Sequence, residues 1–129
     1  MKYLPFTILA LLSLIAFSSC NKPTHDSVAE AEVELVEDLA KILGGVDDEA
    51  SAKAAAKKIE ELAERIDETK KLGEELGEPS EDVKKELKSK YDERRGKAMN
   101  DFISAMSKLG AKPELTKHLD DSLKKLNTF

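Results

Sequence analysis

Aromatic side chains are scarce in this sequence of 129 residues, and tryptophan is absent. Aromatics make up 5% of the chain, and three of the six lie within its first 20 residues. Large aromatic residues commonly fill deep cores and line ligand pockets. Their scarcity predicts a thin core of Leu, Ile, Val and Ala, which suits elongated helices better than a globule that encloses a cavity.

Residues that carry chemistry are few as well. A single cysteine excludes an internal disulfide and the paired cysteines of covalent haem. Neither His25 nor His118 lies in the Glu-x-x-His motif of di-metal carboxylate bundles, since Glu114 and His118 are four residues apart. Serine catalysis would need His118 in a preorganised pocket, whereas its neighbours Asp120 and Ser122 belong to one solvated helix. We therefore predict no catalytic residue, no cofactor and no metal site.

The charge of the chain is modestly acidic and unevenly distributed. The net charge is −5, and Lys2 is the only charged residue among the first 20, so the remainder carries −6. A chain of this charge gains little from phosphate backbones, which argues against a nucleic-acid partner. Residues 21–80 sum to −9 and residues 81–129 to +3. We interpret this as two halves that complement each other within the fold; the alternative is a polarised surface for a charged partner.

The beginning of the chain has the composition of an export signal. Lys2 supplies a positive charge, and residues 4–17 form a mostly apolar run. A membrane-spanning helix needs about 20 such residues, so this run fits the core of a signal peptide. The small residues Ser18 and Ser19 follow, and then Cys20.

The sequence Phe17-Ser18-Ser19-Cys20 resembles the lipobox of bacterial lipoproteins. This resemblance covers residues 1–20 only. It implies cleavage between Ser19 and Cys20 and attachment of lipid to the Cys20 thiol, with acyl chains that anchor the protein to a membrane. Ordinary secretion and a retained membrane anchor remain the alternatives. In the enteric lipoprotein pattern, an Asp directly after the lipidated Cys implies retention in the inner membrane. Residue 21 is Asn instead, so the resemblance favours attachment to the outer membrane, on the side that faces the periplasm.

The rest of the chain has the period of amphipathic helices, with apolar residues at spacings of three and four. Glycines and prolines separate the periodic segments, and we find no alternating, β-rich segment. Asp26 or Ser27 is the expected first N-cap. The predicted division is a signal peptide at 1–19, a lipidated Cys and tether at 20–25, and one helical domain at 26–129. The predicted helices are 26–44, 48–76, 81–109 and 113–127.

The predicted fold class is all-α. Helices 48–76 and 81–109 are long and joined by a short turn, so they should form an antiparallel hairpin. The helices 26–44 and 113–127 should pack at its open base as a small bundle, which leaves only two helices at the tip around residues 67–90. The apolar row of helix 48–76 is Ala52, Ala55, Ile59, Leu62, Ile66, Thr69, Gly73 and Leu76. That of helix 81–109 is Val83, Leu87, Tyr91, Ala98, Phe102, Ala105, Met106 and Leu109, and Met99 and Ile103 are expected in the core as well.

Arg94 interrupts the apolar row of helix 81–109. We interpret it as a side chain that extends over the seam or pairs with a carboxylate on a facing helix. The alternative is a device that selects a register or a partner.

These observations favour a non-enzymatic, lipid-anchored protein with a structural or protein-interaction role, which binds another envelope protein or its own copies. A second hypothesis is a binding module of inhibitor or immunity type, whose acidic first half covers a basic cleft. A third is a carrier of a small apolar ligand, for which the Ala-rich seam leaves little room.

Overall fold

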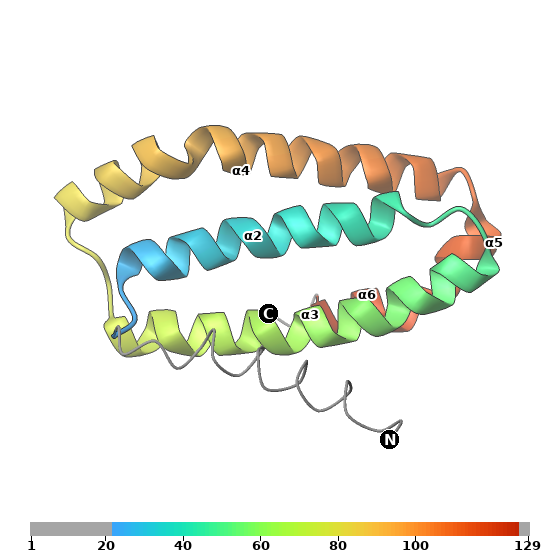
Figure 1. The fold of residues 1–129 in the computed structure, drawn as a ribbon, viewed down its shortest axis with the longest axis horizontal. Helices are drawn as coiled ribbons and strands as arrows, with labels where there is room; N and C mark the ends of the chain where they lie inside the picture. Colours follow the sequence, from blue (N-terminus) through green and yellow to red (C-terminus); the bar gives the residue numbers. More distant parts are fainter. Residues whose placement is uncertain (1–21, 127–129) are drawn as a thin grey trace, which may run out of the picture.

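The computed structural model describes residues 22–126, all of whose regular elements are helices (Figure 1). The all-α prediction is confirmed, and the boundaries of the three long helices agree with the predicted ones to within a residue. The elements are α2 (His25–Gly44), α3 (Glu49–Leu76), α4 (Glu81–Gly110), α5 (Pro113–Thr116) and α6 (Asp120–Leu126). The predicted signal segment, Ser19, Cys20 and the end of the predicted last helix lie outside the described residues.

The helix α2 lies between the two longest helices (Figure 1). It packs most extensively on α4 and second on α3, whereas α6 packs on α3. The helices α3 and α4 run antiparallel, as predicted, and residues 77–80 connect them. Their backbones nevertheless do not pack closely along their lengths among residues 22–126, because α2 occupies the space between them.

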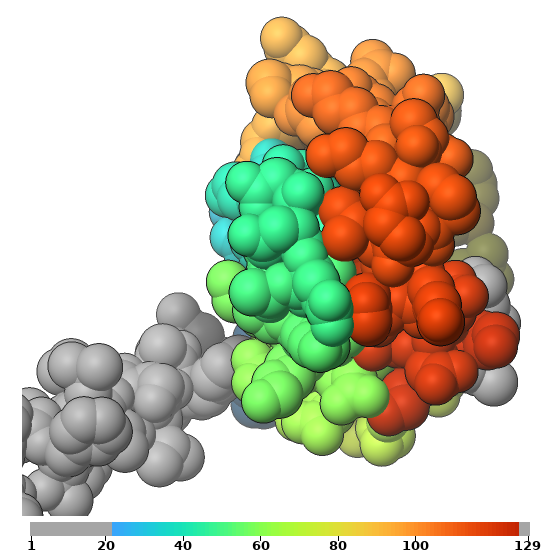
Figure 2. Space-filling view, turned by 90° about the vertical axis from the view of Figure 1, so that its right-hand side faces the viewer, coloured from blue at the N-terminus to red at the C-terminus, as the bar shows by residue number. Residues whose placement is uncertain are grey.

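The main core lies at the base, the end of the molecule that contains α5. Figure 2 views this end, where segments of α2, α3, α4 and the C-terminal helices meet. Side chains from all these elements and from the loop 45–48 form one cluster, as predicted for a small bundle at the base. Its buried members are Leu43, Val46, Ala52, Ala55, Ile59, Ala105, Leu109, Leu115 and Leu119.

The tip, the end that contains residues 77–80, is covered by a third helix. The expectation of only two helices there is wrong, because the first turns of α2 reach it. A side-chain carbon on Gly73 of α3 would lie 3.6 Å from Cγ1 of Val28 in α2. The physical reason is the loop after α2, whose Val46 is 8% exposed and occupies the base cluster. Since the loop fills that space, α2 sits closer to the tip.

The helix ends explain why the chain turns where it does. Thr24 caps α2 through reciprocal bonds with Ser27, so the expectation of a cap at Asp26 or Ser27 is wrong by two or three residues. Asp48 caps α3 in the same way, together with Ser51. Gly77 ends α3 at φ 72 and ψ −171, a conformation that only glycine readily adopts.

The predicted helix 113–127 is two helices. After α5, the amides of His118 and Leu119 bond to carbonyls three residues back, which is the tighter 3₁₀ pattern. This turn places Leu119 in the base cluster at 0% exposure. After the turn, α6 runs along α3.

The predicted row of α3 is buried from Ala52 to Leu62 and half-buried from Ile66 to Leu76, whereas the predicted core of α4 contains two errors. Met99 is 43% exposed and Ile103 is 57% exposed, although we assigned both to the interior. Met99 comes directly after Ala98, and Ile103 comes directly after Phe102, and both Ala98 and Phe102 belong to the row that faces the core. Consecutive side chains are about 100° apart around a helix. The two side chains therefore lie on the outer flank of α4.

Candidate functional site

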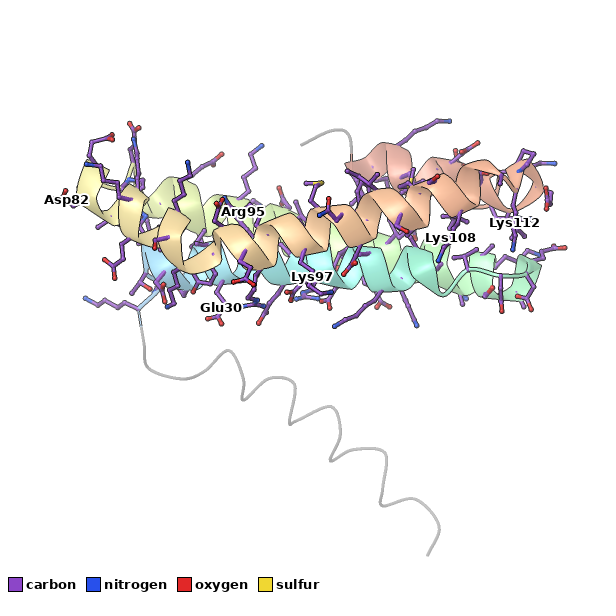
Figure 3. All side chains as sticks on the ribbon, turned by 90° about the horizontal axis from the view of Figure 1, so that it is seen from above. Glu30, Asp82, Arg95, Lys97, Lys108 and Lys112 are labelled. Atoms are coloured by element: carbon purple, nitrogen blue, oxygen red, sulfur yellow. The ribbon has the colours of Figure 1, made fainter. Side chains whose placement is uncertain are left out.

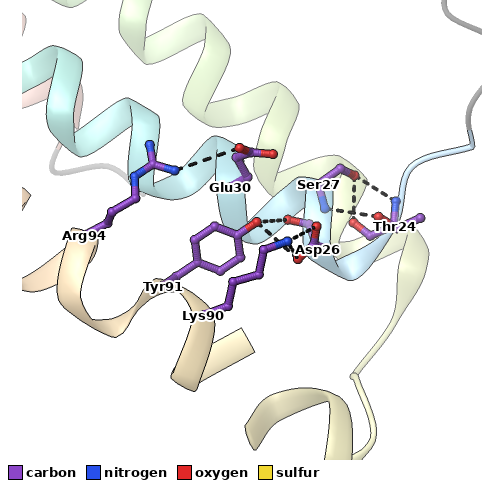
Figure 4. A network of polar contacts seen from close by, with 7 residues as sticks. All are labelled: Thr24, Asp26, Ser27, Glu30, Lys90, Tyr91 and Arg94. Carbon is purple, nitrogen blue, oxygen red and sulfur yellow. Dashed lines mark hydrogen bonds and ion pairs between the residues drawn. The ribbon is translucent and has the colours of Figure 1, made fainter. Parts of the chain in front are cut away.

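A cluster of polar side chains joins α2 to α4 near the tip (Figure 4). The Lys90 ammonium donates to both carboxylate oxygens of Asp26 at 2.8 Å, and the Tyr91 hydroxyl donates to Oδ1 of Asp26 at 3.1 Å. The bond from Lys90 holds the pKa of Asp26 below its usual range, and the bond to Asp26 raises the pKa of Lys90. Tyr91 is 3% exposed and packs with Ala29 and Val33 of α2, so its ring is buried between the two helices while its hydroxyl bonds to Asp26.

Arg94 continues this seam toward the base. Its Nε and Nη2 donate to the two oxygens of Glu37 at 3.2 and 2.9 Å, a bidentate pair. A second carboxylate, Glu30, lies 3.9 Å from Nη1 (Figure 4). The bond from Arg94 lowers the pKa of Glu37 and the bond to Glu37 raises the pKa of Arg94. The interpretation of Arg94 as a pair for a facing carboxylate is confirmed.

The seam accounts for much of the charge asymmetry of the sequence. Arg95 lies 3.7 Å from Glu32, so four carboxylates of α2 meet cations of α4. Glu60 of α3 bonds to Lys125 of α6 at 2.8 Å, which is a further pair between the two halves, whereas Arg65 of α3 pairs with Asp38 of α2 within the first half. The two halves of the chain thus complement each other within the fold, as we interpreted them. Exposed pairs of this kind contribute little stability individually, but they favour one pairing of helices over others.

Several open grooves flank α2. One of about 530 Å³ lies between the last turns of α2 and α4 and is lined by Lys41, Lys97, Lys108 and the small residues Ala40 and Ala105. Two more lie near the tip, one of about 410 Å³ that reaches α4 and one of about 460 Å³ between α2 and α3. All three include charged residues in their walls and open to solvent. A carrier of a small apolar ligand would need a more enclosed and more apolar cavity.

The histidines lie at opposite ends of the molecule. His25 lines the groove at the tip, whereas Nε2 of His118 lies 3.9 Å from a carboxylate oxygen of Glu49 at the base. Ser122 is buried at 3% exposure, while Asp120 is exposed, so the structure does not bring these residues into a catalytic arrangement. Within residues 22–126, no three His, Cys, Asp or Glu side chains are grouped so that they could hold a metal ion.

The most distinctive surface feature is an uncharged row on the outer flank of α4. We name it the α4 stripe: Gly96, Met99, Ile103, Ser107 and Gly110, all of them exposed. The sequence analysis missed it because Met99 and Ile103 were counted as core. The spacing contained the signal, since a strict core row through Tyr91, Ala98 and Ala105 excludes both residues. Figure 3 looks down on α4, with the charged residues Asp82, Arg95, Lys97 and Lys108 of this helix labelled.

The predicted lipidation and cleavage positions, Cys20 and Ser19, lie outside the described residues. In the part of the chain that the structure describes, none of the helices combines the length and the apolar character needed to cross a bilayer. Comparison with known proteins found no match to a family model, to a curated protein or to a solved structure.

Proposed function

We propose that this chain is an exported bacterial lipoprotein whose helical domain has a structural or protein-binding role, without catalysis, at the periplasmic side of the outer membrane. The observation that carries the anchor is the sequence Phe17-Ser18-Ser19-Cys20, which follows a positively charged and apolar segment.

The start of the fold supports this proposal. The capping box of α2 forms at Thr24, only four residues after Cys20. A tether of this length reaches at most about 14 Å, so lipid on Cys20 would hold the first turn of α2 close to the membrane. That turn lies at the tip, where Asp26 contacts Lys90. Lipidation would therefore leave the whole helical domain intact and keep its tip at the membrane surface.

The surface of the domain supports a binding role. The grooves beside α2 are open, and the α4 stripe contains Met99 and Ile103, two of the three large hydrophobic residues that are exposed at 22–126. Exposed apolar patches on small soluble domains commonly mark contacts with other proteins. Four acidic residues of α2 are paired with α4. Exposed acids of α3 such as Glu61 and Glu64 belong to the same acidic half of the chain, so an inhibitor with an acidic face remains the alternative.

The anchor is tested by expression of the full chain in a bacterium. We expect the protein in the membrane fraction, and we expect intact mass measurement to show a chain that begins at a lipid-modified Cys20. The matched control is Cys20→Ser, which removes the thiol and should lose membrane attachment. An unmodified Cys20, or a chain that still contains residues 1–19, would contradict the anchor.

The binding role is tested by cross-linking in the same cells. A photo-reactive residue at position 99 should give a defined cross-linked product, either with one other protein or with a second copy. The same group at Leu72, which is 37% exposed on α3, is the matched control and should not. Equal, diffuse products at both positions would argue against a specific contact on α4.

A further inference from the structure

We propose that two copies of this chain associate through antiparallel contact of their α4 stripes, with Ile103 at the twofold axis. Ile103 is 57% exposed and Met99 is 43% exposed, the two highest values among the exposed large hydrophobic residues at 22–126. The stripe contains no charged residue, although 36% of the chain is charged. This inference deepens the proposed function, because it names the partner that the surface binds.

Gly96 is the second observation. A glycine within a helix disfavours the helix relative to alanine, so its presence calls for a reason. Among the described residues only Gly77 has positive φ, so Gly96 is not needed for its backbone conformation. A side-chain carbon built on it would meet nothing within 4 Å, so it is not needed for packing within one copy either. A helix that approaches from outside supplies the reason.

The spacing of the α4 stripe makes it complementary to itself. Its members follow one another at intervals of 3, 4, 4 and 3 residues, which is symmetric about Ile103. An antiparallel copy therefore places Met99 opposite Ser107 and Gly96 opposite Gly110. Each large residue off the axis then meets a small one, which lets the helices approach closely. Twofold interfaces require one patch to fit itself, and this pattern does so.

Charge selects the antiparallel orientation. A parallel pair would place Lys85, Lys88 and Asp92 of one copy beside the same residues of the other, and like charges repel. In the antiparallel pair, this tip half of α4 extends beyond Gly110 of the other copy instead, which keeps these like charges apart.

The size of the contact predicts a weak complex that anchoring strengthens. The stripe is 15 residues long, or about 21 Å of helix. One such helix contact falls short of the roughly 1,200 Å² that stable complexes bury, so free chains should associate weakly. Two copies anchored to one membrane meet at a higher effective concentration. This step alone rests on the proposed function. In an antiparallel pair the two tethers, residues 20–25 of each copy, lie at opposite ends of the dimer. Both ends are then held at the membrane, so the long axis of the dimer is parallel to the membrane surface.

Cysteine cross-linking in cells that express the full chain tests the geometry. At an interaxial distance of 8–10 Å, facing Cα atoms on a twofold axis lie roughly 4 to 5 Å apart, within reach of a disulfide. We expect Ile103→Cys to give a covalent dimer well above the wild-type background, which contains only Cys20. Met99→Cys alone should not, because its two copies are about 12 Å apart along the axis. Met99→Cys and Ser107→Cys, co-expressed with different tags, should cross-link to each other.

Two further variants test the energetics. Ile103→Glu should lower the yield of lysine-directed, non-disulfide dimer by roughly tenfold or more, since it places two charges at the centre of the contact. Leu72→Glu is the matched control and should leave that yield unchanged. Both sites are exposed, so circular dichroism should show an intact fold.

Two outcomes would overturn the proposal. One is the absence of an Ile103→Cys dimer, and the other is a Met99→Cys dimer as abundant as the Ile103→Cys dimer, which would mean a parallel pair. Failure of the anchor is read separately from the mass of the amino terminus in the same samples.

Discussion

Replacement of Leu119 with alanine tests whether the C-terminal segment closes the base of the bundle. The side chain of Leu119 is 0% exposed, and it lies in the turn between α5 and α6 rather than in a helix. Leucine-to-alanine changes in cores cost about 2 to 5 kcal/mol, with larger values where the site cannot collapse. Ala52, Ile59 and Leu109 of the same cluster are at most 2% exposed, and only residues 111–112 link α4 to α5, so the surroundings have little freedom to move. We therefore expect a loss of about 3 kcal/mol.

A loss of this size is large beside the total stability of a small domain, which is about 5 to 15 kcal/mol. It should lower the melting temperature by roughly 12 to 24 °C. Urea and thermal unfolding, followed by circular dichroism at 222 nm, measure both quantities. The matched control is Leu72→Ala, since Leu72 is 37% exposed and its truncation should cost no more than about 0.5 kcal/mol. A cost below about 1 kcal/mol for Leu119→Ala would refute the packing of the C-terminal segment described above.

Three further predictions concern α4 and its seam with α2. Gly96→Ala should stabilise the domain by about 1 kcal/mol, because the helix gains propensity and nothing lies within 4 Å of the new carbon; a lower melting temperature in dilute solution would show that this glycine has a role within one copy. Tyr91→Phe should cost about 1 kcal/mol in urea unfolding, because the ring stays buried while the 3.1 Å bond to Asp26 is lost; an unchanged midpoint would mean that this bond contributes nothing. The pKa values of Asp26 and Glu37 are lowered in the folded chain, so the stability that they contribute is present above their unfolded pKa and is lost as pH falls through the folded one. The melting temperature should therefore decline below about pH 4, where carboxylates titrate, and Asp26→Asn should lessen this decline; a profile identical in the variant would contradict the pairing.

The local structure followed from the sequence because its signals lie within a few residues of each other. The apolar period, the breaks at Gly44 and Gly77, and Ser80 before α4 set three long helices to within a residue. The first cap was misplaced because Thr24, Asp26 and Ser27 are all residue types that cap helices. Only the reciprocal bonds between Thr24 and Ser27 distinguish the true one.

The candidate surface was predicted only in part. Arg94 was recognised as unusual because a cation interrupts an apolar row, and its carboxylate partner was expected without being identified. Met99 and Ile103 were assigned to the core because they are apolar and adjacent to true core residues. Burial depends on which neighbours arrive from elsewhere in the chain, and the outer flank of α4 receives none that cover these two side chains.

The sequence by itself determined the all-α class, the boundaries of the three long helices, the opposite charges of the two halves and the expectation of lipid on Cys20. Each of these depends on residue type and on spacing along the chain. The tertiary structure decided that α2 separates α3 from α4, that the predicted last helix turns at residues 117–119, and that the α4 stripe remains exposed. These depend on how helices share a limited space. Because the loop residue Val46 occupies part of the base, α2 lies nearer to the tip than expected. The residue pattern within any one helix does not indicate this position.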